Sequence, residues 1–599
     1  MDFYGFYMGQ EFEAYRFLGA QVQGDGSVVF RTFAPNAASI SVIGDFNSWQ
    51  GSDMHKIYDG NFWELTVPQV EVGSRYKFRI TSQTGKTIDH CDPYGFGSEK
   101  RPNTASVVHT LDSYSFRDGA WMDRRGEGDQ QPLNIYEVHL GSWQRKSDAP
   151  DDWCTYEELA QRLIPYVKEC GYNYVEFLPI SEHPCDESWG YQITAFYAPT
   201  SRYGTARELM MLIDRLHQAG IGVILDFVPA HFAVDDYGLA KYDGTALYEY
   251  PHRDVEVSEW GSHNFMHSRG EVRSFLQSCA RYWLEEFHFD GLRMDAISRI
   301  LYWQGDEARG VNGDGVAFLR TMNQGLKRLC PGCILAAEDS TNFPKVTAPA
   351  EQEGLGFDYK WDMGWMNDTL DYFRTDPLFR GGCYHKLTFS MAYYYDSNYL
   401  LPLSHDEVVH GKATILQKMF GDYEMKFPQA RAFYMYMYAH PGKKLNFMGN
   451  EIGHFREWDE KREQDWGLLT YPAHQDFHRF MTDLNHFYLE HPAFFEKDYD
   501  GDGFRWLDCH AEEQCIYAFE RAGKKERIAA VFNFSGIEQA NYKLEIPDAA
   551  GLRRLFTSER QGYGGSVSDT AKILKPDKGA FEFTLAPFSA EYYLIEEDD

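Results

Sequence analysis

The sequence lacks features that mark several whole classes of protein. It contains no uninterrupted apolar run of about 20 residues, the length that a helix needs to cross a bilayer. The first residues, MDFYGFYMGQ, show no basic start followed by an apolar stretch, so we expect no signal peptide here. No G-x-G-x-x-G or Walker sequence follows a predicted strand, so a nucleotide site has no support.

Positive charge is also scarce. The chain has 58 lysine and arginine residues against 90 aspartate and glutamate residues, which leaves a formal net charge of −32. Proteins that bind nucleic acid or anionic membranes need clustered positive charge to neutralise phosphates. The composition therefore argues against both kinds of partner.

The cysteines do not form a disulfide framework. Ten of them are scattered along 599 residues without regular spacing, which favours a reducing, cytoplasmic location. Cys330 and Cys333 have the spacing of a redox motif, but they stand between a predicted helix and a predicted strand. A thioredoxin-type motif has the reverse order, so we interpret this spacing as coincidence.

The remaining sequence divides into a long middle segment between two β-rich ends. Stretches such as SVVFRTFAP and SRYKFRI alternate apolar and polar residues and are broken by turns, which is typical of a small β-sandwich. The last hundred residues follow the same pattern. We predict an N-terminal leader over 1–15, a β-sandwich over 16–112, a linker over 113–131, a catalytic domain over 132–492 and a C-terminal β-sandwich over 493–599.

The middle segment alternates strands with helices. The helical stretches after Thr155 and Thr205 each begin with a T-x-x-E capping box and end at a glycine. Eight such strands predict a (β/α)8 barrel, so the whole chain is a multidomain α/β protein with flanking all-β domains. A doubly wound open sheet is the structural alternative. The strand candidates begin at 134, 173, 222, 290, 333, 357, 399 and 444.

Charged residues gather where four of these strands end. In a barrel, the carboxyl ends of the strands surround one mouth, which is where active sites lie. We therefore expect these side chains to converge on a single catalytic site. They are Asp226 and His231 after the third strand, Arg293 and Asp295 on the fourth, Glu338 and Asp339 after the fifth, and His405, Asp406 and Glu407 after the seventh.

The residue types favour glycosyl transfer. Paired carboxylates without a cofactor can supply a nucleophile and a general acid. Asp295 suits the first role because residues two apart on a strand share one face, which places Arg293 beside it. A buried structural ion pair is the alternative interpretation. Glu338 suits the acid, yet the pattern alone cannot separate it from Asp339, and the pair after the seventh strand is equally ambiguous.

Four segments resemble the ordered sequence regions of the α-amylase superfamily. They are DFVPAH (226–231), GLRMDAIS (291–298), AEDS (337–340) and LSHDE (403–407). IYEVHLGSW (135–143) and PGKKLNFMGNEIGHFREWD (441–459) resemble the 1,4-α-glucan branching enzymes within it, and APNAASISVIGDFNSW resembles their glycogen-binding-type β module.

The resemblance implies a role for each candidate residue and settles both ambiguities. Asp295 matches the nucleophile, Glu338 the acid/base and Asp406 the third carboxylate, which holds the ring hydroxyls of the sugar. The matching substrate-binding residues are Arg293, which orients the nucleophile, His231 and His405, which donate hydrogen bonds, Tyr191, an aromatic platform, and Asp226 of the first region.

The implied activity is a retaining transfer that makes α-1,6 branches from α-1,4-glucan in glycogen biosynthesis. No cofactor is implied, and the segment 229–270 is short beside the calcium-binding insert common in α-amylases, which argues against a metal requirement. The expected partner is the glucan polymer, and the chain is expected to be a monomer or weak homo-oligomer. Trp189 and Trp458 are candidates for lining the glucan path, and Trp49 and Trp63 for contacts in the β module. The alternatives are a debranching or trehalose-releasing hydrolase and a non-catalytic glucan-binding protein.

Overall fold

The eight predicted strands form a closed parallel barrel in the computed structural model, which describes residues 1–126, 128, 130–568 and 571–597. The last strand pairs with the first, so the open-sheet alternative is wrong. The barrel strands are β10 (Asn134–Val138), β11 (Tyr174–Phe177), β14 (Gly222–Phe227), β17 (Gly291–Met294), β18 (Ile334–Ala337), β19 (Tyr359–Trp361), β20 (Tyr399–Leu403) and β21 (Lys443–Phe447).

Helices surround the barrel, and both predicted capping boxes are confirmed. Thr155 and Thr205 each exchange hydrogen bonds with the glutamate three residues on, which satisfies free N–H groups in the first turn. The longer helices are α4 (Tyr156–Glu169), α5 (Ala206–Gln218), α7 (Gly270–Glu286), α9 (Gly313–Leu329), α10 (Met363–Arg374), α13 (Tyr423–Ala439) and α14 (Pro472–Glu490).

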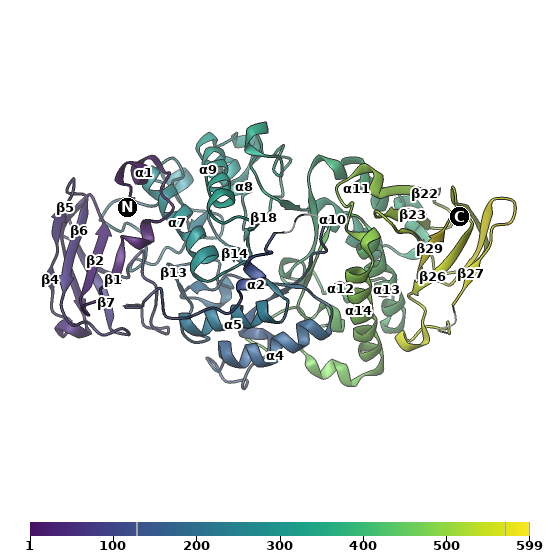
Figure 1. Cartoon of the computed structure of the whole chain (residues 1–599), viewed down its shortest axis with the longest axis horizontal. Coiled ribbons are helices and arrows are strands. Elements are labelled where there is room, and N and C mark those ends of the chain that lie inside the picture. Colours follow the sequence, from purple (N-terminus) through teal and green to yellow (C-terminus); the bar gives the residue numbers. More distant parts are fainter. Residues whose placement is uncertain (127, 129, 569–570, 598–599) are drawn as a thin grey trace.

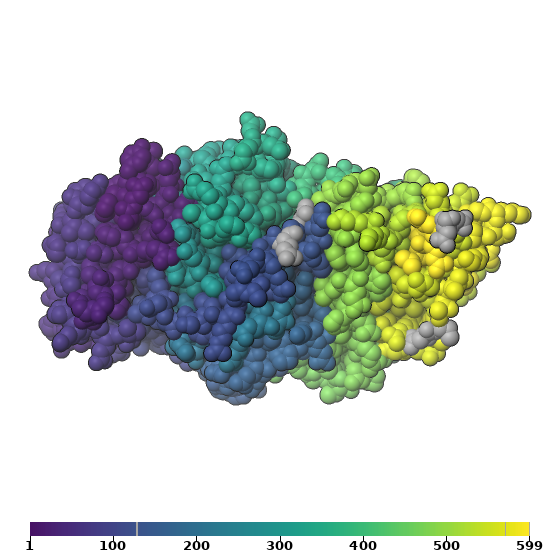
Figure 2. Space-filling view, viewed as in Figure 1, coloured from purple at the N-terminus to yellow at the C-terminus, as the bar shows by residue number. Residues whose placement is uncertain are grey.

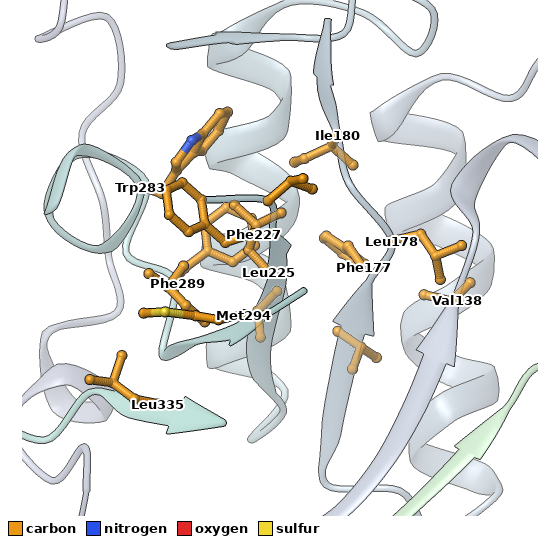
Figure 3. Packing of buried hydrophobic residues seen from close by; sticks show 14 of the residues in the cluster. Val138, Phe177, Leu178, Ile180, Leu225, Phe227, Trp283, Phe289, Met294 and Leu335 are labelled. Atoms are coloured by element: carbon orange, nitrogen blue, oxygen red, sulfur yellow. The ribbon is translucent and has the colours of Figure 1, made fainter. Parts of the chain in front are cut away.

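The two faces of each barrel strand have different surroundings. Leu225, Phe227 and Met294 point outward into the core that includes Trp283 of α7 (Figure 3). The alternate residues point into the barrel. They form an apolar cluster, the apolar layer, that includes Leu133, Ile135, Ile224, Ala336, Tyr359, Trp361, Leu400 and Leu445.

The N-terminal module is a β-sandwich, as predicted, and lies at the left of Figure 1. Its facing sheets share a core that includes Phe30, Val42 and Phe78. One sheet has the order β1 (Gly19–Val22), β2 (Val28–Phe33), β6 (Phe62–Val67) and β5 (His55–Ile57). The other has β4 (Ser52–Asp53), β3 (Ala37–Gly44), β7 (Arg75–Ser82) and β8 (Thr87–His90), with β9 (Ser106–Val107) also paired to β7.

Residues 1–15, set apart by the sequence as a leader, pack against the barrel helix α7. Their helix α1 (Phe3–Met8) receives a hydrogen bond of 2.9 Å from Ser274 Oγ to the Phe6 carbonyl. Gly270, the first residue of α7, is needed for this contact because a Cβ there would lie 1.7 Å from the Tyr7 carbonyl oxygen. Any side chain at 270 would therefore push the N-terminal helix away.

The C-terminal region is all-β, as predicted, and lies at the right of Figure 1 beside α13 and α14. Arg521 joins it to the barrel domain by donating a hydrogen bond of 2.7 Å to the carbonyl of Ala439 at the end of α13. Its larger sheet has the order β22 (Phe504–Ala511), β23 (Ile516–Ala522), β24 (Arg527–Asn533), β29 (Ser589–Glu596), β26 (Gly551–Thr557) and β27 (Ile573–Leu574). The second sheet pairs β25 (Gln539–Glu545) with β28 (Ala580–Leu585).

The predicted linker contains a short helix, α2 (Gly119–Met122), which lies near the middle of the face seen in Figures 1 and 2. Its neighbour Asp118 and the barrel residue Asp290 enclose His217 of α5, with N–O distances of 2.7 and 2.8 Å. Trp121 stacks on the His217 ring at 5.2 Å. Burial alone would lower the pKa of His217, yet the two carboxylates outweigh it and raise this pKa to about 9.

This cluster predicts a pH-dependent contribution to stability. Below the ordinary histidine pKa of 6.5 the full contribution is present, and it is lost as the pH rises through about 9. His217→Gln should lower the free energy of unfolding by about 3 kcal/mol at pH 6, because it removes the cation that pairs with two buried carboxylates, of which Asp118 also has a second histidine contact, with His288. The difference from wild type should shrink above pH 9. Denaturant unfolding at both pH values measures it, with the exposed His55→Gln as control. An equal difference in the free energy of unfolding between wild type and His217→Gln at both pH values would contradict this prediction.

Candidate active site

The predicted site residues meet at the carboxyl-terminal mouth of the barrel. They surround a cavity of about 760 Å³. Its wall also contains Trp260 and Arg299, from the segments after β14 and β17. Of the predicted set, the residues that line the cavity are Tyr191, His231, Arg293, Asp295, Glu338, His405 and Asp406.

The alternation of side chains along strand β18 determines that Glu338, and not Asp339, faces the cavity. Ala336 points into the barrel with the apolar layer, whereas Ala337 belongs to the outer core. Two residues on from Ala336, Glu338 faces the cavity. Asp339 points away, and its Oδ2 lies 3.1 Å from Lys360 Nζ.

Asp406 and Glu407 differ in the same way. Asp406 lines the cavity, and about half of its side chain is exposed. Glu407 is buried behind it. Lys412 contacts both carboxylates, at 3.2 Å from Asp406 Oδ2 and 3.3 Å from Glu407 Oε1. Of these two residues, only Asp406 therefore offers its carboxylate to a ligand in the cavity.

Arg293 connects the carboxylates beneath the mouth. Its Nη1 donates hydrogen bonds of 2.7 Å to Asp226 Oδ1 and 2.8 Å to Asp295 Oδ1. Its Nη2 lies 3.4 Å from Glu338 Oε2, and the guanidinium stacks over Trp361 at 4.3 Å. Arg293 thus forms a buried ion pair and also contacts Asp295 and Glu338, the two carboxyl groups predicted to react.

The chain turns sharply directly after β17. The sequence analysis placed Asp295 on this strand, but the strand ends at Met294. Ala296 has a φ of +47°, a left-handed conformation that costs a residue with a Cβ about 1–2 kcal/mol. The turn directs the Ala296 N–H toward the site, where it donates a hydrogen bond of 2.6 Å to Glu338 Oε2.

The surroundings of Glu338 and Asp406 shift the pKa values of these two carboxyl groups in opposite directions. Burial raises the pKa of Glu338, and the negative charges of Asp295 and Asp406 add to this rise while Arg293 opposes it. Burial alone would also raise the pKa of Asp406, yet His405 and Lys412 outweigh it and lower this pKa. Glu338 is therefore suited to carry a proton, while Asp406 is suited to remain charged.

Asp226 lies beneath the cavity and is absent from its lining among the described residues. It is buried, accepts a hydrogen bond from the hydroxyl of Tyr191 and pairs with Arg293. Burial raises its pKa to about 7, while Arg293 opposes the rise. In the structure Asp226 contacts Tyr191 and Arg293, and its contact with substrate stays a prediction.

His405 is held by a residue that the sequence interpretation missed. Glu137 of β10 accepts a hydrogen bond of 2.9 Å from the His405 backbone N–H, and its Oε1 lies 2.5 Å from Nδ1. Burial would lower the pKa of His405, but Glu137 outweighs it and raises this pKa. The signal in the sequence was a glutamate two residues after the inward-facing Ile135 of a buried strand. Tyr191 stacks against the same ring at 5.6 Å.

A second inward glutamate lies in the neighbouring strand. Glu176 of β11 is paired in register with Glu137 and is buried. Its carboxyl oxygens have no hydrogen-bond partner among the described residues. Burial, with Glu137 and Asp226 nearby, raises the pKa of Glu176 well above the ordinary value, which favours its protonated, neutral form.

The wall of the cavity near His231 carries an exposed tryptophan. Trp260 is 47% exposed, and its ring lies 5.3 Å from that of His231. Arg299 stacks over Trp260 at 4.6 Å. Burial lowers the pKa of His231 to about 4, so it is a neutral hydrogen-bonding group. Trp260 was missed because it lies in a loop without a periodic pattern.

The tryptophans predicted to bind glucan have different environments. Trp189 lines the cavity, while Trp458 is buried and donates a hydrogen bond of 2.9 Å to Ser142 Oγ. In the N-terminal module, Trp63 is 5% exposed and its indole N–H bonds to the Ala34 carbonyl. Trp63 is therefore a core residue, whereas Trp49 is partly exposed.

The described residues contain no group of three or more His, Cys, Asp or Glu side chains arranged to hold a metal. Cys330 and Cys333 are both buried and free, and burial raises their pKa values to about 12 and 11. Such thiols are poor nucleophiles, unlike those of a redox motif. Within the part of the chain that the structure describes, no helix is long and apolar enough to cross a membrane.

Family models match all three parts of the chain. Residues 17–95 match carbohydrate-binding module 48 (isoamylase N-terminal domain), 145–244 the alpha amylase catalytic domain and 506–596 the alpha amylase C-terminal all-beta domain. The crystal structure of the pullulanase SAP of GBS in complex with maltotetraose has a TM-score of 0.75. It shares 14% identity and aligns over 97% of this chain and 88% of its own.

Curated relatives are similar along nearly the whole length. The 1,4-alpha-glucan branching enzyme GlgB of Halothermothrix orenii is 42% identical, over 99% of this chain and 98% of its own. The protein of the same name from Francisella philomiragia is 45% identical, over 94% of this chain and 91% of its own.

Proposed function

Since the chain belongs to the family of 1,4-alpha-glucan branching enzymes, we propose that it cuts α-1,4-glucan and rejoins the released chain through an α-1,6 bond, with Asp295 and Glu338 as the reacting groups. The observation that carries this assignment is the position of Arg293, which contacts both carboxylates at the cavity mouth. Arg293 donates a hydrogen bond to the Asp295 carboxylate, while burial raises the pKa of Glu338 and favours a proton there.

The first half of the reaction breaks the α-1,4 bond. The Asp295 carboxylate attacks the anomeric carbon, and a covalent bond forms between them. Glu338 gives its proton to the departing glycosidic oxygen, so the leaving chain keeps a free 4-hydroxyl. Retaining enzymes of this type hold their two carboxyl groups about 5–5.5 Å apart.

The second half makes the branch. Glu338, now ionised, takes the proton from a 6-hydroxyl of an acceptor glucan as that oxygen attacks the anomeric carbon. The bond to Asp295 breaks, and both carboxyl groups regain their starting states. Two inversions at one carbon leave the α-configuration unchanged.

The other cavity residues hold the sugar in this scheme. Asp406, kept charged by His405 and Lys412, accepts hydrogen bonds from ring hydroxyls. His231 and His405 donate hydrogen bonds, and Tyr191 offers its ring as a platform. None of these steps requires a cofactor or a metal.

An assay that counts both chain structure and chain ends tests the function. Purified protein is incubated with amylose in the presence of a chelator, and iodine staining is followed together with reducing ends. We expect the stain to fade while reducing ends stay constant, because transfer replaces each cut bond. Reducing ends that rise with the fading would indicate a hydrolase, and no change in either would indicate a binding protein.

We also propose that the protein acts in the cytoplasm as a monomer or weak homo-oligomer. All ten cysteines are free, which supports a reducing compartment. Cell fractionation tests the location. Sedimentation at several protein concentrations tests the oligomeric state.

A further inference from the structure

Residues 98–106 of the N-terminal module form a segment that reaches the rim of the barrel. Its two ends are tied together by the bridge between Ser98 and Ser106, and by the hydrogen bond of 3.0 Å from the Glu99 N–H to the Ala105 carbonyl. The next residues form β9, which pairs with β7 of the sandwich. Arg101 therefore stands on a segment that the module itself holds in place.

Arg101 makes its contacts outside its own module. One terminal nitrogen, Nη2, lies 2.5 Å from Asp186 Oδ2 and 2.5 Å from Asp151 Oδ1. The guanidinium also stacks over Trp153 at 5.3 Å. Since the Arg101 side chain is 28% exposed and that of Asp186 is 23% exposed, their ion pair is partly shielded from water.

The barrel holds Asp186 from the other side. Arg202 Nε donates a hydrogen bond of 2.9 Å to Asp186 Oδ1, so each carboxylate oxygen has its own arginine. The buried Arg202 also donates to Glu182 Oε1 and to the His183 carbonyl, both at 2.8 Å. Asp186 thus joins the N-terminal module to a fixed part of the catalytic domain.

The segment that begins at Asp186 forms one wall of the active site. A single 3-10 turn covers Asp186–Ser188, and Trp189 follows in a left-handed conformation with φ +55°. Trp189 and Tyr191 line the cavity. Asp186 therefore stands three residues before one cavity aromatic and five before the other.

We propose that Arg101 is a positioning residue for the active site. By holding Asp186 from the N-terminal module, it keeps the segment 186–192 in the conformation that presents Trp189 and Tyr191 to the glucan. It touches no reacting atom and acts through Asp186. The N-terminal module contributes to the barrel's active site by this contact, in addition to any glucan that it binds itself.

Arg101→Ala should weaken substrate binding more than it slows the chemical step. If the segment 186–192 holds its competent conformation for a smaller fraction of the time, the apparent affinity falls by that fraction. Bound glucan restores the conformation, so we expect KM for amylose to rise about fivefold while kcat stays within about twofold. Hydrogen exchange of the backbone amides in 186–192 should become faster without substrate.

Two matched variants separate this role from general effects of charge removal. Arg79→Ala removes an ion pair with Asp89 that lies inside the same module, and it should leave both KM and exchange unchanged. Asp151→Ala removes the other carboxylate partner of Arg101 while leaving Asp186 in place, and it should also stay near wild type. Arg101→Lys, which keeps one charge without the planar guanidinium, should recover part of the loss.

The proposal rests on the proposed function, and the same experiment distinguishes the failure of each. A wild-type protein that forms no branches overturns the function, whereas hydrogen exchange still measures the contact. An active wild type with an Arg101→Ala variant of unchanged KM and unchanged exchange overturns the positioning role. So does an Arg101→Ala variant that only unfolds more easily while its kinetics match wild type, or an Asp151→Ala variant with the same defect.

Discussion

Asp295→Ala should lose branching activity by more than about 10⁴-fold, because the covalent intermediate has no other acceptor atom. The fold should survive, because Arg293 keeps its hydrogen bond to Asp226 and its contact with Trp361. The measurement is the rate of branch formation on amylose, with the melting temperature recorded for the same protein.

The size of this loss tests the role directly. Removing one partner of a partly exposed carboxylate contact changes stability modestly, whereas removing a nucleophile removes the pathway. An Asp295→Ala variant that keeps its melting temperature and forms branches within tenfold of the wild-type rate would contradict the assignment of Asp295 as nucleophile. Asp339→Asn is a suitable control, because that carboxylate adjoins the acid/base residue and points away from the cavity.

Glu338→Gln should lower the rate on amylose by about 10²–10⁴-fold, the usual contribution of a positioned general acid. The glutamine keeps the shape and can still accept the hydrogen bond from the Ala296 N–H, but it has no proton to give to the leaving oxygen. A glucosyl fluoride, whose leaving group needs little protonation, should still react with Asp295. The glycosyl-enzyme should then accumulate, because no base activates the acceptor.

Mass spectrometry of the digested protein locates the added sugar. We expect it on the peptide that contains Asp295 in Glu338→Gln, and on no peptide in the double variant with Asp295→Ala. Failure to detect any glycosyl group in Glu338→Gln, or full activity of this variant on amylose, would contradict the division of roles between the two carboxylates.

The architecture was predictable because its signals are local and periodic. The capping boxes at Thr155 and Thr205 fix the starts of two helices, alternation of apolar and polar residues marks the strands of the flanking modules, and short apolar runs mark the barrel strands. The choice between Glu338 and Asp339 was different. A period of two tells which residues share a face, but only packing tells which face is inside, and Ala336 supplied that information in the structure.

Other parts of the site depend on contacts between distant segments. Glu137 stands 268 residues before its partner His405, so no local pattern links them. The left-handed turn at Ala296 interrupts a stretch that has the composition of a strand. Trp63 was a candidate for glucan contact because its residue type suits stacking on sugars, but it is buried in the sandwich. The sequence predicted which residue types would gather at the site. The contact partners of each residue could be identified only from the folded structure.

The apolar layer beneath the site closes the barrel from below, with Ile135, Ile224 and Leu400 among its members. Donor glucan, acceptor glucan and water therefore compete for the glycosyl-enzyme through the same opening. The ratio of branches formed to bonds hydrolysed then depends on how fully acceptor chains occupy that opening. Acceptor chains that fill the opening exclude water from it, so we expect the share of hydrolysis to fall as the polymer concentration rises.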